Sequence, residues 1–228
     1  MKVSLYTLNV NGFSPEITDL TFPLLKRYAE KIEAEFVEIK ERCYPEMPAV
    51  YEKFQIHRLM EERGDDWALF WDADALVHPD LPNLTELISP DTVAHNGVDF
   101  GPVRWQYDDY LRRDGRHISS CTWCVICPRM CRDLWQPLTD LTLEQAVARI
   151  FPIQNELNTT KTPTSLIDDF VLSRNIARYG LKFVTLTDLF KRWPGSDGGY
   201  FWHAYTIPPD EKLVAMRAQL KTWGLRVK

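Results

Sequence analysis

The sequence lacks several features that would place it in common classes of protein. It has no apolar run long enough to span a membrane. Its first residues, MKVSLYTLNVNGF, contain no small-residue cleavage site after an apolar stretch. Positive charge is not in excess: the formal net charge is −5, so no overall field attracts nucleic acid or acidic membranes. We therefore expect a cytoplasmic protein without a membrane span.

Cysteine is scarce outside one segment. Four of the five cysteines lie within CTWCVICPRMC, and the set comprises Cys121, Cys124, Cys127, Cys131 and the isolated Cys43. The clustered spacing is typical of bacterial iron–sulfur ligands. The intervening apolar residues and the proline after the third cysteine also fit a buried strand, in which cysteine acts as a small hydrophobe. We expect the strand with reduced thiols, and a four-cysteine cluster or a zinc site is the alternative.

Apolar patterns divide the first third of the chain into alternating strands and helices. Short apolar runs predict strands at residues 2–10, 36–39 and 67–71. Helical patterns lie between them, from about Ser14 with a break or restart at Pro23, and over 50–65. This β-α-β-α-β order predicts a mixed, mostly parallel α/β sheet with helices on both faces. Ligands of such sheets bind beyond the carboxyl ends of the strands.

The second half is less regular. Its expected strands and helices are strands at 92–96 and 118–127, short helices at 129–136 and 142–150, a helix at 165–180, a strand at 182–186 and a C-terminal helix. Ser165 is a candidate N-cap for the helix at 165–180. No internal repeat or linker divides the chain, so we expect one domain over residues 1–228.

Two carboxylates follow the predicted third strand. Asp72 and Asp74 are separated by one alanine, at the point where WALFW opens into a turn. Oxygen donors in this arrangement suit Mg²⁺ or Mn²⁺, which keep open positions for phosphate groups. An acidic turn without a ligand is the simpler alternative.

The residues around this turn resemble a known family. The stretch YEKFQIHRLMEERGDDWALFWDADALVHPDL is similar to the donor-binding half of nucleotide-sugar glycosyltransferases of the GT-A fold. The resemblance implies a Rossmann-like GT-A domain, with residues 1–96 as the donor half and 97–228 as the acceptor and catalytic half. It also implies that Asp74 binds the metal and that Asp72 faces the donor's ribose and the metal.

Further donor contacts follow from the same resemblance. Tyr6 and Thr7, at the end of the first strand, match the positions that hold the base and ribose. Lys53 matches the basic residue near the donor, although a solvated lysine on a helix face is as common.

A second acidic motif lies in SLIDDFVLSRNIARYGLKFV. The resemblance implies that Asp169 is the catalytic base of an inverting enzyme. Asp168 stands where the family usually has glutamate. Its spacing from Ser165 also fits a simple helix start, where an acid suits the helix dipole.

The resemblance assigns roles near the chain end as well. Many metal-dependent members use a late histidine as a ligand, and His203 is placed for this in YFWHAYTIPPDEK. Lys212 is expected to touch the diphosphate. The glycine-rich loop 194–200 is expected to close over the donor.

The implied function is transfer of a sugar from a nucleoside diphosphate, with a UDP-sugar as the expected donor, to an acceptor hydroxyl. Mn²⁺ or Mg²⁺ is the implied cofactor. An inverting mechanism is expected, and a retaining one stays open. The acceptor is not specified: a glycan, a small molecule, a protein or a modified nucleic-acid base all fit. Four tryptophans could stack on it or fill the core: Trp105, Trp123, Trp193 and Trp202.

Two other functions fit parts of the sequence. ALFWDADALV is also similar to the first motif of haloacid-dehalogenase-type phosphohydrolases, with Asp72 as nucleophile, Asp74 as acid/base and LIDDF as Mg²⁺ ligands. In that family the motif follows the first strand, whereas here a predicted β-α-β-α unit precedes it. A non-catalytic nucleotide-binding protein of the GT-A fold is the second alternative.

Overall fold

The computed structural model describes residues 1–97, 107–118, 120–157, 163–191, 199–203 and 207–225. Within them a central sheet has the strand order β2-β1-β3-β6-β5-β7. Its strands are β1 (Val3–Leu8), β2 (Glu35–Ile39), β3 (Trp67–Trp71), β5 (Thr92–Gly97), β6 (Ser120–Pro128) and β7 (Lys182–Thr185). Only β6 runs antiparallel to its two neighbours in this sheet. The expected mixed, mostly parallel sheet is confirmed.

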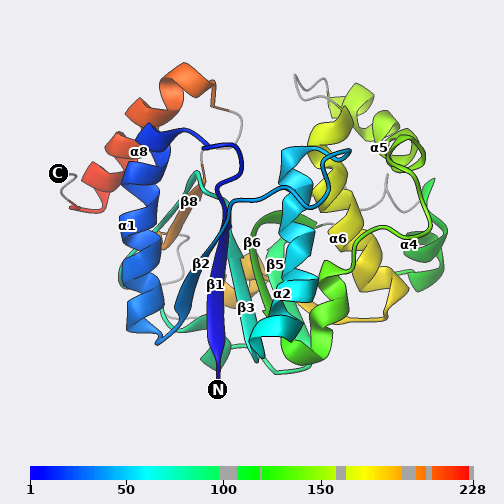
Figure 1. Ribbon diagram of the computed structural model, residues 1–228, viewed down its shortest axis with the longest axis horizontal. Helices are drawn as coiled ribbons and strands as arrows, with labels where there is room; N and C mark the ends of the chain where they lie inside the picture. The colour runs from blue at the N-terminus through cyan, green and yellow to red at the C-terminus, as the bar shows by residue number, and fades with distance from the viewer. Residues whose placement is uncertain (98–106, 119, 158–162, 192–198, 204–206, 226–228) are drawn as a thin grey trace.

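Helices cover both faces of the sheet (Figure 1). One side carries α1 (Pro15–Lys31), and the other carries α2 (Ile56–Arg63) and α6 (Ile167–Arg178). The strand WALFW is buried at all of its residues, as a strand covered on both faces must be. The remaining elements are η1 (Ala49–Gln55), η2 (Leu84–Glu86), α4 (Asp109–Asp114), η3 (Arg129–Trp135), α5 (Leu143–Leu157), η4 (Pro163–Leu166), α7 (Leu186–Lys191) and α8 (Pro209–Thr222).

The structure corrects three expected helix features. Pro23 lies inside α1, which is continuous, because Phe22 and Leu25 on either side of it are both buried against the sheet. The expected helix at 50–65 is divided into η1 and α2, and Gly64 ends it with a φ of 71°. Ser165 is not the N-cap of α6: the helix begins after Leu166, without a side-chain cap.

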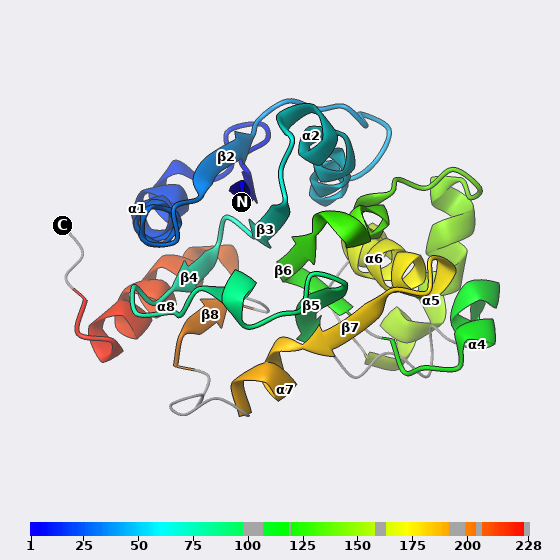
Figure 2. The ribbon, with the colours of Figure 1, turned by 90° about the horizontal axis from the view of Figure 1, so that it is seen from below.

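A second, two-stranded sheet was not foreseen. It pairs β4 (Ala75–Val77) with β8 (Phe201–His203) in antiparallel register, with Ala75 opposite His203. In Figure 2, β4, β8 and α8 lie together beside the end of β3. Leu76 of this sheet packs with apolar residues of α1 and α8, so the C-terminal segment is anchored next to the turn that follows β3.

Candidate metal-binding and catalytic site

A cavity of about 320 Å³ opens beyond the carboxyl ends of β1 and β3. Its lining comes from segments that are far apart in the sequence: Leu8, Val10, Phe13, Ala49, Val50, Asp72, Ala73, Asp74, Cys121, Thr122, Trp123, Ser165, Asp168, Asp169, His203 and Lys212. The apolar lining residues come mostly from the segment after β1 and from η1. The carboxylates come from the turn after β3 and from the start of α6.

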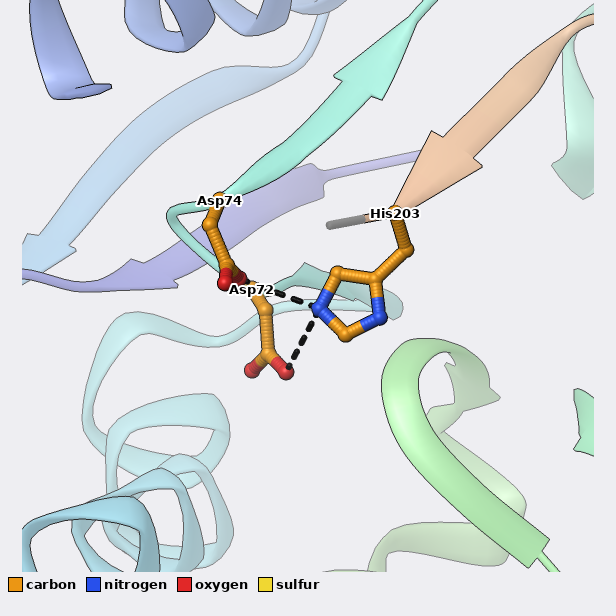
Figure 3. A group of neighbouring side chains, drawn as sticks. All are labelled: Asp72, Asp74 and His203. Atoms are coloured by element: carbon orange, nitrogen blue, oxygen red, sulfur yellow. Dashed lines mark hydrogen bonds and ion pairs between the residues drawn. The ribbon is translucent and has the colours of Figure 1, made fainter. Parts of the chain in front are cut away.

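Asp72, Asp74 and His203 point toward one another in this cavity (Figure 3). His203 Nε2 lies 3.0 Å from Asp74 Oδ1 and 3.8 Å from Asp72 Oδ2. One possible ligand atom from each of the three residues lies within 4.8 Å of the other two. Among the described residues, this is the one group of histidine, cysteine or acidic side chains that meets this criterion. Two carboxylates and an imidazole suit a divalent cation of the Mn²⁺ or Mg²⁺ type. The donor set therefore fits the metal that the sequence implied.

Backbone pairing explains why these three side chains meet. The Asp72 N–H donates to the Trp123 carbonyl (2.8 Å), which fixes the turn against the start of β6. The β4–β8 pairing then carries His203 to the same turn. Trp123 stacks on the His203 ring with centroids 5.2 Å apart and an angle of 14° between the planes. The imidazole is thus held between an aromatic face and two carboxylates.

Lys212 reaches the same group from α8. Its Nζ donates to Asp74 Oδ2 at 2.5 Å. Burial acts to raise the pKa of Asp74, but the hydrogen bonds and charges of His203 and Lys212 outweigh it, and the pKa is lowered. Asp72 shows the opposite result: burial dominates and raises its pKa, although Lys53 and His203 act to lower it. Asp74 is therefore the more firmly ionised of the two.

Lys53 is neither a solvated surface residue nor part of the cavity lining. Its side chain is fully buried, and its ammonium contacts three acceptors: Asp168 Oδ2 at 2.6 Å, Thr122 Oγ1 at 2.9 Å and Asp72 Oδ1 at 3.2 Å. Burial acts to lower the pKa of Lys53, but Asp168 and Asp72 raise it above its ordinary value. Lys53 thus links the two acidic motifs instead of lining the space expected for a donor.

The two acids of the second motif have different surroundings. Asp168 binds Lys53 and the Thr122 hydroxyl, the latter at 2.6 Å; burial acts to raise its pKa, but Lys53 and these hydrogen bonds lower it. Asp169 lines the cavity, and its Oδ1 accepts the Thr122 N–H at 2.8 Å with the Thr122 hydroxyl at 3.1 Å. Asp168 therefore lies in the first turn of α6, as expected for an acid at a helix start, and is also the ion-pair partner of Lys53.

Tyr6 and Thr7 do not line the cavity. Both are fully buried, and the Tyr6 hydroxyl donates to Asp65, which precedes β3 at the opposite end of the sheet. β1 continues past Tyr6 and Thr7 to Leu8, and the residues that line the cavity are Leu8 and Val10, further along the chain. The structure therefore places neither side chain at the cavity, and a donor contact by Tyr6 or Thr7 stays a prediction.

Sequence reasoning missed Thr122 as a site residue. It lies between Cys121 and Cys124, in the segment whose cysteine spacing resembles that of metal ligands. A single threonine in a strand has no sequence pattern that indicates a functional role. What places Thr122 in the site is its position at the start of β6, an antiparallel strand next to the Asp72 turn. That neighbour relation depends on the sheet topology, which the sequence pattern does not contain.

The four clustered cysteines do not converge. All are free, and they lie on or just after β6. Cys124 packs on the α1 side of the sheet, whereas Cys127 and Cys131 pack on the α6 side. Side chains on opposite faces of a strand cannot bind one ion together. Of the expected lid 194–200, residues 194–198 lie outside the described part of the chain, as do Trp105 and Trp193.

The fold is shared with a solved glycosyltransferase. A glycosyltransferase involved in the glycosylation of the major capsid of PBCV-1 superposes with a TM-score of 0.52 over 95% of this chain and 100% of its own, at 12% identity. The galactosyltransferase LgtC, solved with donor and acceptor sugar analogs, gives a TM-score of 0.46 over 97% of this chain and 95% of its own, at 8% identity. A197 from STIV gives 0.34 over 58% and 68%, at 14% identity. The first likeness confirms the expected GT-A type of fold.

Two further comparisons found no match. No family model and no curated protein sequence matches the chain. Within the described residues, no helix has the length and apolar character of a membrane span.

Proposed function

We propose that this protein is a metal-dependent glycosyltransferase that moves a sugar from a nucleoside-diphosphate donor, a UDP-sugar in the first instance, to an acceptor hydroxyl. The observation that carries the proposal is the Asp72–Asp74–His203 group, which opens into the same cavity as the carboxylate of Asp169. A cation site and a proton acceptor in one cavity are what this transfer requires. The shared fold is compatible with it.

The cavity divides into two chemical regions that suit a nucleotide sugar. The apolar part, with Leu8, Val10 and Phe13, would receive the base and ribose. Lys212 would contact the diphosphate, because an ammonium forms strong charge-assisted hydrogen bonds with phosphate oxygens. Lys53 would act indirectly, by fixing the carboxylates of Asp72 and Asp168.

Asp74 and His203, with Asp72, would hold Mn²⁺ or Mg²⁺. When bound there, the cation would neutralise negative charge on the departing diphosphate. Asp74 is suited to this role because its pKa is lowered, so it is anionic at neutral pH.

Asp169 would accept the proton of the acceptor hydroxyl. In that step the acceptor oxygen bonds to the anomeric carbon, the bond from that carbon to the diphosphate breaks, and the nucleoside diphosphate leaves with the bonding electrons. The Thr122 N–H fixes one carboxylate oxygen of Asp169 and so orients the group. General-base help of this kind contributes about 10²–10⁴-fold to the rate.

Replacement of Asp169 tests the proposal. In a panel of nucleoside diphosphate sugars with Mn²⁺, Asp169→Asn should lower nucleoside diphosphate release about 10²-fold or more, while UDP binding by calorimetry changes little. Asp19→Asn, the same change at an exposed position of α1, should behave like the wild type. Transfer that persists in Asp169→Asn would contradict the base, and equal loss of binding and transfer would show a structural residue. The anomeric configuration of the product, read by NMR, separates inversion from retention.

The phosphohydrolase alternative receives no support from the structure. The Asp72 turn follows β3, with β1, α1, β2 and α2 ahead of it, and β3 pairs antiparallel with β6. A nucleotide-binding protein without turnover would bind UDP in the same cavity, and the transfer assay above distinguishes it.

A further inference from the structure

Both oxygens of Asp74 are already engaged. His203 Nε2 lies 3.0 Å from Oδ1, and Lys212 Nζ donates to Oδ2 at 2.5 Å. The Asp74 side chain is only 13% exposed, so few other positions around it are open to a ligand. A cation that binds Asp74 must therefore share this carboxylate with the Lys212 ammonium or displace it.

The two lysines of the site differ in how firmly they are held. Lys53 pairs with Asp72, is fully buried and has three acceptors. Lys212 pairs with Asp74 and has a side chain that is 20% exposed to solvent. Of the two ammonium groups that face the carboxylates, only Lys212 is partly exposed to solvent, so it is the one that can leave its carboxylate without being transferred through the protein interior.

The backbone that carries Lys212 is anchored. Met216 and Leu220 of α8 pack on Ile17 and Leu20 of α1, and the two helices lie side by side in Figure 1. Lys212 itself lies in the first turn of α8. The positive end of a helix dipole disfavours an ammonium, and a nearby anion offsets this effect. In this structure that anion is Asp74.

We propose that Lys212 is a tethered cation that occupies Asp74 until a diphosphate arrives, so that the metal ion and the nucleoside diphosphate bind cooperatively. This inference rests on the proposed function. Without nucleotide, a divalent cation competes with the ammonium for one carboxylate and is repelled by it. With nucleotide, the phosphate oxygens give Lys212 another partner, and Asp74 is released for the metal.

The arrangement has a direct consequence for binding order. If UDP tightens Mn²⁺ binding by some factor, Mn²⁺ tightens UDP binding by the same factor. Part of this coupling factor comes from movement of the Lys212 ammonium from Asp74 to the diphosphate. The coupling factor should therefore become smaller when the ammonium is removed. The site would remain poorly loaded with metal until a donor is present.

Mn²⁺ titrations followed by the electron paramagnetic resonance signal of the free ion test this. Without UDP, Lys212→Met should bind Mn²⁺ about tenfold more tightly than the wild type, equivalent to ~1.4 kcal/mol of removed competition. The factor by which UDP tightens Mn²⁺ binding should fall by a similar amount. Lys212→Arg keeps a positive charge and should bind Mn²⁺ more weakly than Lys212→Met when UDP is absent. Lys221→Met, at an exposed lysine near the other end of α8, is the control that should match the wild type. Lys212→Gln repeats the charge removal with a polar side chain.

The outcomes separate the two claims. Equal or weaker Mn²⁺ binding by Lys212→Met and Lys212→Gln, with a wild type that binds Mn²⁺, would overturn the role of Lys212 and leave the metal site standing. Failure of every variant to bind Mn²⁺, with or without UDP, would overturn both this inference and the proposed metal-dependent function.

Discussion

Asp72 and Asp74 are chemically identical and separated by one residue, yet their surroundings act on them in opposite directions. The pKa of Asp72 is raised, with burial as the main cause. The pKa of Asp74 is lowered, because His203 and Lys212 outweigh its burial. A metal site needs at least one firmly ionised carboxylate, and Asp74 provides it. Asp72 supplies a second oxygen whose charge is already shared with Lys53.

A buried histidine outside the cavity should make the stability of the protein depend on pH. His95 is fully buried beside Phe183, and burial lowers its pKa to about 4. In the unfolded chain its pKa is near 6.5, so the unfolded state binds more protons between these values and stability falls as pH falls. Between pH 7.5 and 5.0 this single group should remove about 2 kcal/mol from the free energy of unfolding.

His95→Phe tests the assignment, because it keeps a ring against Phe183 and removes the titrating group. Urea unfolding at pH 7.5 and 5.0 should show a smaller loss of stability in the variant than in the wild type. Identical losses in the two proteins would mean that other groups cause the acid sensitivity.

The sequence predicted which acidic and histidine side chains gather at one cavity, and the role of each in binding or catalysis stays a prediction. Asp72, Asp74, Asp169 and His203 were named from the sequence, and all four line the cavity. Thr122 was missed, because its importance comes only from the acids that the fold places around it. Lys53 was predicted to contact the donor, whereas its ammonium contacts Asp72 and Asp168. The sequence pattern indicates a lysine on a helical segment but not the direction of its side chain.

The Lys53 ammonium joins four elements that are distant in sequence. Lys53 lies in η1, Asp72 follows β3, Thr122 lies in β6 and Asp168 lies in the first turn of α6. The Lys53 ammonium also lies 4.7 Å from the centre of the Phe70 ring. A buried charge with several partners fixes the relative position of all the elements that contribute to it.

Removal of this charge should destabilise the fold. Lys53→Met keeps most of the side-chain volume but leaves Asp168, which is 7% exposed, without its cation. The loss of one partner of a buried ion pair costs about 3–5 kcal/mol. Urea unfolding should show a decrease of this order, and Lys40→Met, at an exposed lysine, should change stability by less than about 0.5 kcal/mol.

The double variant sharpens this test. Lys53→Met combined with Asp168→Asn removes both charges and should recover part of the stability lost in Lys53→Met. Unfolding of Lys53→Met at the same urea concentration as the wild type would show that the buried pair does not hold these elements together.

Elements with strong periodicity or full burial were predicted well, and short or context-dependent ones were not. β1, β2 and β3 fall where the apolar runs placed them. β8 was missed because three residues after a glycine-rich segment carry no strand pattern, and its pairing with β4 is a tertiary contact. The predicted break at Pro23 is wrong, because the packing of α1 side chains against the sheet stabilises the helix by more than the loss of one backbone hydrogen bond costs.

The site as a whole depends on the direction of β6. Parallel strands β1 and β3 end at the same edge of the sheet, where ligands of open α/β sheets bind. Because β6 is antiparallel to β3, its first residues lie at that edge also, with Cys124 opposite Trp71. Thr122 and Trp123 thereby join residues from β3, α6 and the C-terminal segment around one cavity.

The most direct test of the account is the position of Mn²⁺ in crystals soaked with MnCl₂ and UDP. We expect one anomalous scattering peak between the side chains of Asp72, Asp74 and His203, with the diphosphate of UDP against it. Asp74→Asn crystals soaked in the same way should lose the peak, since the carboxylate that is held ionised is gone. An anomalous map with no peak at Asp74 in the wild-type protein, or with Mn²⁺ and UDP bound elsewhere, would contradict the proposal.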